Sequence, residues 1–93
     1  MRECLLYSDC RVDELGVEYA GTSSTTVSGR TCQAWSSDTP HSHGYDDDEF
    51  IDGSRAAAQN YCRNPDDPPY EGGLWCYTTD PDMRWDFCDV PLC

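Results

Sequence analysis

The sequence predicts a small disulfide-rich fold that is mostly loop, with a few short antiparallel β-strands. Three observations predict this class. The chain has only 93 residues, seven of them are cysteine, and prolines and glycines break up the runs that could form long helices or strands. A domain of this size buries too little surface to be stable by apolar packing alone. In so short a chain, cysteine at this density indicates a disulfide framework formed in an oxidising compartment. We therefore expect one domain of an extracellular protein, either secreted or part of an ectodomain.

The segments before residue 62 predict little regular structure. TSSTTVSGR at 22–30 is rich in β-branched and hydroxyl side chains and ends in Ser-Gly, which favours a short strand and a turn. TPHSHGYDDDEFIDGS at 39–54 combines proline, glycine and a run of acids, so we expect a loop. SRAAAQNY at 54–61 predicts one or two helical turns, with Ser54 as the cap.

The C-terminal third predicts a hairpin that follows a turn-rich loop. DDPPYEGG at 66–73 is punctuated by Pro-Pro and Gly-Gly and is expected to be loop. LWCYTTD at 74–80 and MRWDFC at 83–88 alternate large apolar with polar residues, which predicts two short strands joined by a turn. Trp35 is predicted to lie in the core, because it offers a large apolar surface to a domain with few aliphatic side chains.

The charge of the chain is strongly negative. There are 18 acids against six arginines and no lysine, which gives a formal net charge of -12. Such a surface repels nucleic acid and anionic lipid, and it suits cationic partners or simply keeps the domain soluble. No apolar run is long enough to span a membrane. MRECLLYSD has no apolar core of the length that a signal peptide needs, so we expect a processed form.

Five sequence elements together resemble the kringle family. They are YAGTSSTTVSGRTCQAWSSDTPHSH, NYCRNP, LWCYTTDP, RWDFC and the closing PLC, in the family's order and with near-family spacing between cysteines. The resemblance implies a kringle-like domain at 10–93 preceded by an N-terminal extension at 1–9. It also implies a non-catalytic binding module without a cofactor.

The resemblance also implies a disulfide pairing, which sequence alone leaves open among fifteen pairings of six cysteines. The family pairs its cysteines first to sixth, second to fourth and third to fifth. Carried onto this chain, the pairs are Cys10–Cys93, Cys32–Cys76 and Cys62–Cys88. Cys4 is then the odd cysteine, a candidate interchain link. A rival assignment makes Cys4 the first family cysteine and leaves Cys10 spare, with poorer spacing.

Kringles that bind ligands carry a shallow aromatic trough with acids at one end and a base at the other. The trough takes lysine and similar zwitterions, because carboxylates meet the ammonium, a cation meets the carboxylate, and flat rings contact the methylene stem. On the positions of this chain, the resemblance implies a ligand-binding set of Asp66, Asp67, Trp75, Tyr77, Arg84 and Trp85. The partner is then expected to be a protein with exposed lysine or other cationic groups.

The chain departs from the family's binding pattern at the cation end. Family binders carry two acids separated by one residue, whereas Asp66 and Asp67 are adjacent and Pro68 stands where the second acid belongs. The loop that follows is longer than in the family, and Glu71 is a candidate substitute acid. Tyr45 stands where strong binders have a second base. The competing interpretation is that the tryptophans belong to the framework and bind no ligand.

Metal and catalytic interpretations are weaker. No paired CxxC supports zinc. The acidic run at 46–49 and Asp52 do not match an EF-hand, so we expect a solvated loop. His41 and His43 are expected to make framework hydrogen bonds. The sequence contains no nucleophile motif such as GxSxG that would indicate an enzyme. The alternatives that remain are an assembly module of an extracellular protein or fibre linked through Cys4, and a docking module that uses another face.

Overall fold

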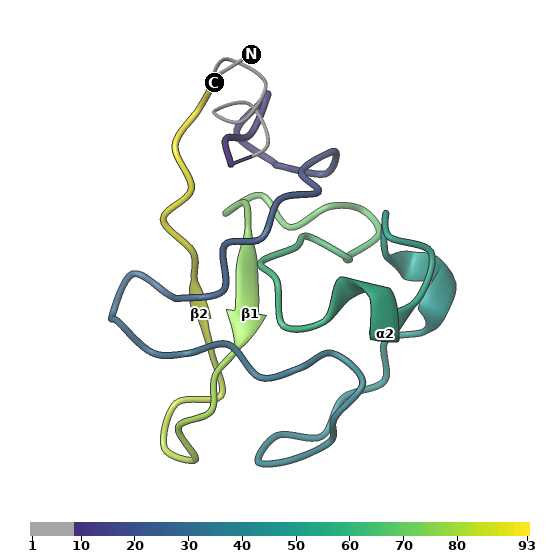
Figure 1. Ribbon diagram of the computed structural model, residues 1–93, viewed down its shortest axis with the longest axis vertical. Helices are drawn as coiled ribbons and strands as arrows, with labels where there is room; N and C mark the ends of the chain where they lie inside the picture. Colours follow the sequence, from purple (N-terminus) through teal and green to yellow (C-terminus); the bar gives the residue numbers. More distant parts are fainter. Residues whose placement is uncertain (1–8) are drawn as a thin grey trace.

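Loops wrapped around one short hairpin make up most of the chain in the computed structural model, which describes residues 9–93 (Figure 1). The regular elements are the 3₁₀ turn η1 (Asp47–Glu49), the helix α2 (Arg55–Ala58), and the strands β1 (Trp75–Tyr77) and β2 (Trp85–Phe87). β1 and β2 pair antiparallel. No helix within residues 9–93 has the length and apolar character needed to cross a lipid bilayer. The predicted fold class is confirmed.

The predicted hairpin and helical turn are confirmed, and so is the Ser-Gly turn within 22–30, but the strand expected before that turn is reduced to isolated bridges. The Ser54 hydroxyl caps α2 by accepting from the backbone of Ala57 at 3.0 Å. Between residues 22 and 30, only isolated bridges form, at Thr25 and Thr26. The reason is local: the Thr26 hydroxyl accepts from the backbone N–H of Arg30 at 3.1 Å. That bond closes a tight turn where a strand would have continued its ladder.

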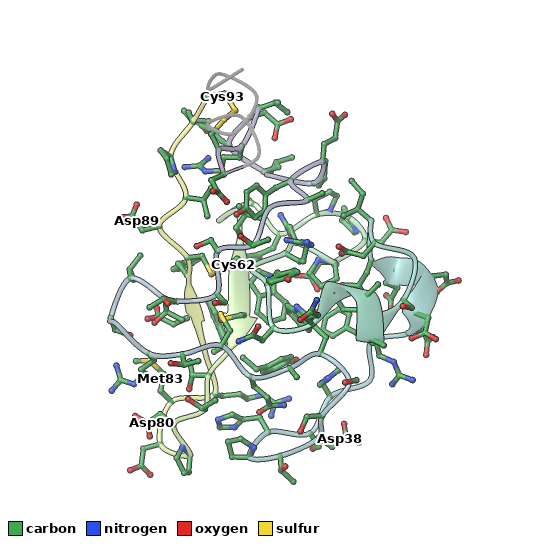
Figure 2. The ribbon with its side chains drawn as sticks, in the orientation of Figure 1. Asp38, Cys62, Asp80, Met83, Asp89 and Cys93 are labelled. Atoms are coloured by element: carbon green, nitrogen blue, oxygen red, sulfur yellow. A yellow bond between two sulfur atoms is a disulfide. The ribbon has the colours of Figure 1, made fainter. Side chains whose placement is uncertain are left out.

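The three disulfides join Cys10–Cys93, Cys32–Cys76 and Cys62–Cys88, so the predicted pairing is confirmed and Cys10 is the first cysteine of the pattern. The last two disulfides pack against each other, with their four sulfurs within 4.8 Å (the sulfur cluster). Figure 2 shows Cys62 inside the molecule and Cys93 at its end. Because all four sulfurs are oxidised, they offer no thiolate to zinc. The interchain link expected of Cys4 lies outside the described residues.

Trp35 is the centre of the core and is only 1% exposed, as predicted. Its ring lies 5.0 Å from that of Phe50 and 5.3 Å from that of Trp75, centroid to centroid. Its Nε1 donates to the Tyr61 carbonyl at 2.7 Å, which satisfies the polar end of the side chain. The histidines of PHSH make framework contacts, as expected: His43 Nε2 bonds to the Trp35 carbonyl at 2.7 Å.

The acidic loop is tied to the framework by arginines. Asp47 accepts from Arg55 at 2.9 Å, and Asp52 accepts from the buried Arg63 at 2.8 Å. Arg63 also donates through Nη1 to the carbonyls of Gly21 and Cys62. Two acids of the calcium candidate set are thus occupied by guanidinium groups.

Candidate functional site

The hairpin places four aromatic side chains on one face. Side chains alternate along a strand, so Trp75 and Tyr77 share a face while Cys76 lies on the other. Trp75 pairs with Phe87 and Tyr77 pairs with Trp85, which brings the rings of both strands to the same face. Trp75 and Tyr77 are buried, whereas Trp85 is 40% exposed. The face is therefore core at β1 and open to solvent at Trp85, while Phe87 of β2 is half-buried.

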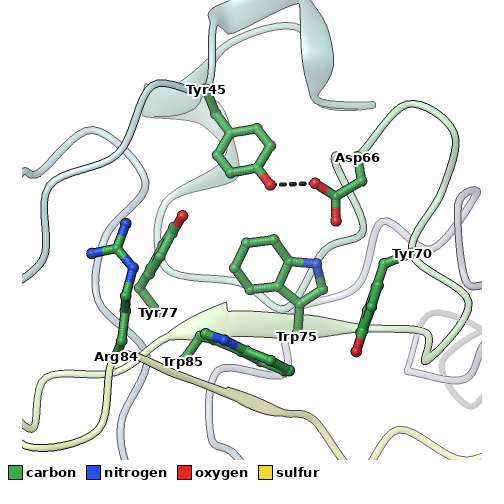
Figure 3. A pocket seen from close by; sticks show the side chains of 7 residues that line it. All are labelled: Tyr45, Asp66, Tyr70, Trp75, Tyr77, Arg84 and Trp85. Carbon is green, nitrogen blue, oxygen red and sulfur yellow. Dashed lines mark hydrogen bonds between the residues drawn. The ribbon is translucent and has the colours of Figure 1, made fainter.

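A hollow of about 270 Å³ lies over this face, and we call it the aromatic hollow (Figure 3). Five rings, one acid and one base line it. They are Tyr45, Asp66, Tyr70, Trp75, Tyr77, Arg84 and Trp85. Of the side chains predicted from the sequence, Asp67 is the one that does not line it.

Tyr70 reaches the hollow because the loop that carries it is fixed at its base. The buried Asn64 accepts from the Tyr70 backbone N–H and donates to the Tyr70 carbonyl, each at 3.0 Å. The Tyr70 ring then stacks on Phe87 with centroids 5.9 Å apart and planes at 10°. Gly72 permits this stacking, since a Cβ there would lie 2.5 Å from the Phe87 ring and 2.8 Å from the Tyr70 ring.

At one end of the hollow, the Tyr45 hydroxyl donates a hydrogen bond to Oδ1 of Asp66 (Figure 3). Burial raises the pKa of Tyr45, and the hydrogen bond to the Asp66 carboxylate raises that pKa further, so Tyr45 is a neutral donor. Within residues 9–93, Oδ2 of Asp66 accepts no hydrogen bond from the protein. One carboxylate oxygen is thus left for a ligand.

At the other end lies Arg84, on the far side of the rings from Asp66 (Figure 3). Its Nη2 donates to the Ser42 carbonyl at 2.8 Å, and its guanidinium carbon lies 4.9 Å from the Tyr77 ring centroid. Burial raises the pKa of Tyr77, while the positive charge of Arg84 opposes that rise. The guanidinium is therefore fixed in place with further N–H groups left for a ligand carboxylate.

Asp67 and Glu71 belong to a different depression. Both line a shallow neighbouring hollow beside the loop prolines, together with Asp66 and Tyr70. Glu71 thus does not line the aromatic hollow in place of the missing second acid. Asp66 stands at the border between the two depressions.

The wall of the aromatic hollow contains an unpartnered polar atom. Trp75 Nε1 is the one buried side-chain nitrogen or oxygen within residues 9–93 that has no hydrogen-bond partner. In Figure 3 it lies on the side of the indole toward Asp66 and Tyr70. Buried donors are nearly always paired, so this N–H is an exception at the wall of the hollow.

Sequence reasoning missed Tyr70. It lies in the loop that is longer than in the family, and the signal that could have found it is the Gly-Gly that follows. Tyr45 stood out only as a missing base, whereas in the structure it binds the acid of the hollow.

Comparisons with known proteins agree with this architecture. A family model described as the kringle domain matches residues 10–93. The human protein named putative apolipoprotein(a)-like protein 2 is 50% identical over 78 residues, which is 84% of this chain and 55% of that protein. Plasminogen of Capra hircus is 49% identical over 78 residues, 84% of this chain and 59% of that protein. The chain thus spans somewhat over half the length of the relatives it matches.

Proposed function

The chain belongs to the kringle family, a family of non-catalytic protein-binding modules, and on that premise we propose that its aromatic hollow binds a cationic group of a protein partner. The observation that carries the proposal is the placement of Asp66 and Arg84 at opposite ends of a ring-lined hollow (Figure 3). Two opposite charges separated by rings match a zwitterion with an apolar stem. A terminal lysine of a protein has this chemistry.

The electrostatics support one orientation of the ligand. Oδ2 of Asp66 is left to meet an ammonium, and the ring faces of Trp85 and its neighbours attract the same positive charge. Arg84 repels a cation and attracts a carboxylate. With an overall charge of -12, the domain also draws cationic partners from a distance.

The setting that we propose is extracellular. Three disulfides hold the described chain together, and such bonds persist in oxidising compartments. The domain would thus meet its partner outside the cell, as a secreted protein or as part of an ectodomain.

The test is a titration with a lysine analogue that keeps its free carboxylate, followed by tryptophan fluorescence and backbone amide shifts. With one acid where strong family binders have two, we expect millimolar affinity, about -4 kcal/mol at standard state. Raised salt should weaken this binding.

Asp66→Asn should weaken binding by about 1.5–3 kcal/mol, because it removes a charge-assisted contact. Asp67→Asn is the matched control, since it makes the same change in the neighbouring hollow and should leave binding nearly unchanged.

Two further variants separate the ends of the ligand. Arg84→Ala should weaken carboxylate-bearing ligands more than plain amines, which do not use that end. Trp85→Ala should weaken both, since both lie along its ring. If titration to tens of millimolar moves neither fluorescence nor amide shifts, the hollow is framework and the proposal is wrong.

A further inference from the structure

We infer that the aromatic hollow prefers an N-methylated, quaternary ammonium to a primary ammonium, on a ligand that also carries a carboxylate. The inference rests on the proposed function and names its ligand class: a trimethylammonium group separated by a short methylene stem from a carboxylate. Either a free betaine or a protein ending in trimethyllysine has this chemistry.

The hollow has few acceptors for a primary ammonium. Such a group carries three N–H donors and is strongly hydrated, so a site that takes it must replace several water acceptors. Asp66 supplies the one carboxylate in the lining, and the Tyr45 hydroxyl already uses one of the two acceptor positions on its Oδ1. Asp67 and Glu71 face the neighbouring depression, and Pro68 has no side-chain acceptor. Beyond the Asp66 carboxylate, the lining side chains offer only phenol oxygens.

The same hollow is rich in aromatic surface. Tyr70 and Trp85 meet at 85° with centroids 5.8 Å apart, and Trp75 and Trp85 meet at 71° with centroids 6.0 Å apart. Rings at such steep angles form the sides of a corner, so a group placed there contacts more than one ring. A quaternary ammonium needs no acceptors and is attracted by rings within about 6 Å of their centroids. Trp85 and Tyr70 are both exposed, with 40% and 38% of their surfaces open.

Arg84 decides which end the cation takes. Its guanidinium already lies 4.9 Å from the Tyr77 ring centroid, so that part of the hollow is occupied by positive charge. A ligand cation is therefore directed to the corner formed by Tyr70, Trp75 and Trp85, beside Asp66. The ligand carboxylate is left for Arg84. The missing second acid weakens the hollow more for a primary ammonium than for a quaternary one, because the quaternary group loses only the charge attraction and no hydrogen bond.

The experiment compares three ligands that share a five-methylene stem and a carboxylate: ε-aminohexanoate, its N-trimethyl derivative, and the neutral isostere in which tert-butyl replaces trimethylammonium. Calorimetry or amide-shift titration of the whole chain gives three dissociation constants. We expect the N-trimethyl ligand to bind at least about fivefold more tightly than each of the others. Tighter or equal binding of the primary amine overturns this inference and leaves the proposed function standing. Equal binding of the tert-butyl ligand also overturns it, because charge is then not recognised. If none of the three binds, the proposed function fails as well.

A variant tests the physical reason. Tyr45→Phe frees the acceptor position on Oδ1 of Asp66 that the Tyr45 hydroxyl uses. It should therefore strengthen binding of the primary amine and reduce the preference for the N-trimethyl ligand. Asp67→Asn is the control that should leave the preference unchanged. A preference for the N-trimethyl ligand that is the same in Tyr45→Phe as in the parent chain contradicts the argument from missing acceptors.

A peptide ending in trimethyllysine, compared with the same peptide ending in lysine, identifies the source of the ligand. The same preference supports a protein-borne group, and a preference confined to the free ligand supports a small betaine.

Discussion

Arg63 donates two parallel hydrogen bonds to Asp52, from Nε to Oδ1 and from Nη2 to Oδ2, each 2.8 Å long. The side chains are 3% and 13% exposed. Because Nη1 also bonds to the Gly21 and Cys62 carbonyls, this one guanidinium joins three separate parts of the loop framework.

Removing one partner of this ion pair should strongly destabilise the domain. Asp52→Asn leaves a buried guanidinium without its counter-charge, a change that typically costs about 3–5 kcal/mol. Denaturant unfolding with the disulfides intact measures the loss. The control is Asp47→Asn, which removes an exposed partner of Arg55 and should change the unfolding midpoint little. Equal losses of unfolding free energy in the two variants would contradict the idea that burial gives the Asp52–Arg63 pair its larger effect.

The same pair makes stability depend on acid pH. The hydrogen bonds and the positive charge of Arg63 lower the pKa of Asp52 below its ordinary value. A lowered pKa means that the contribution to stability is complete above the unfolded-state pKa of about 3.9 and is lost as the pH falls through the folded-state pKa. Unfolding free energy measured between pH 2 and 6 should therefore fall less steeply for Asp52→Asn than for the parent chain. If the unfolding free energies of the two chains fall in parallel with pH, other carboxylates cause the loss of stability in acid.

Trp35→Phe and Trp75→Phe form a matched pair of core substitutions. Both tryptophans are buried, but Trp35 Nε1 donates to the Tyr61 carbonyl while Trp75 Nε1 has no partner. Trp35→Phe thus leaves a carbonyl unsatisfied, whereas Trp75→Phe removes an unsatisfied donor. We expect Trp35→Phe to destabilise by about 1–3 kcal/mol more, measured by chemical unfolding. A larger loss in Trp75→Phe would mean that Nε1 has a partner in solution.

Gly72→Ala should disturb the aromatic hollow. Its new Cβ would lie within 2.5 Å of the Phe87 ring and 2.8 Å of the Tyr70 ring, so the stacked pair must separate. We expect weaker ligand binding and altered Tyr70 ring shifts in NMR spectra. Gly44→Ala is the control, because nothing lies within 4 Å of a Cβ at that position. Unchanged binding in Gly72→Ala would show that Tyr70 contributes nothing to recognition.

Calcium should not stabilise the domain. Asp47 and Asp52 are already bound to Arg55 and Arg63, so a calcium ion would have to break those pairs to use their oxygens. Thermal unfolding in calcium and in chelator should give the same midpoint. Saturation at 100 times a dissociation constant would add about 2.7 kcal/mol, a shift that the measurement resolves easily.

The sequence predicts the frame of this domain better than its site. The disulfide pairing followed from the resemblance to the family, and the hairpin followed from alternation in LWCYTTD and MRWDFC. At Thr26 the predicted strand is reduced to an isolated bridge, because the Thr26 hydroxyl accepts from the backbone of Arg30, a competition that strand propensity does not weigh. Trp75, Tyr77, Arg84 and Trp85 were assigned to the site from the resemblance, and all four line the aromatic hollow. Their role in binding a ligand stays a prediction.

The loop side of the site was harder to predict. Asp67 was assigned to the site with Asp66, but successive loop residues point in different directions, and Asp67 lines the neighbouring depression. Tyr70 enters the hollow through contacts with Asn64 and Phe87, which lie six and 17 positions away along the chain. Such contacts leave no periodic trace in a single sequence.

The sulfur cluster has a consequence for how such a domain can change. Disulfides join the interior of the domain. The loop that carries Asp66 and Tyr70 is attached to this interior at its base, through Asn64, and contains no disulfide itself. An insertion or a new residue at the tip of such a loop alters what the hollow accepts while the bonded frame stays the same. This loop can therefore vary with less effect on folding than Trp75 and Tyr77, which line the hollow and are also buried in the core. A library that randomises 66–71 on a constant background would therefore yield folded proteins with new selectivities.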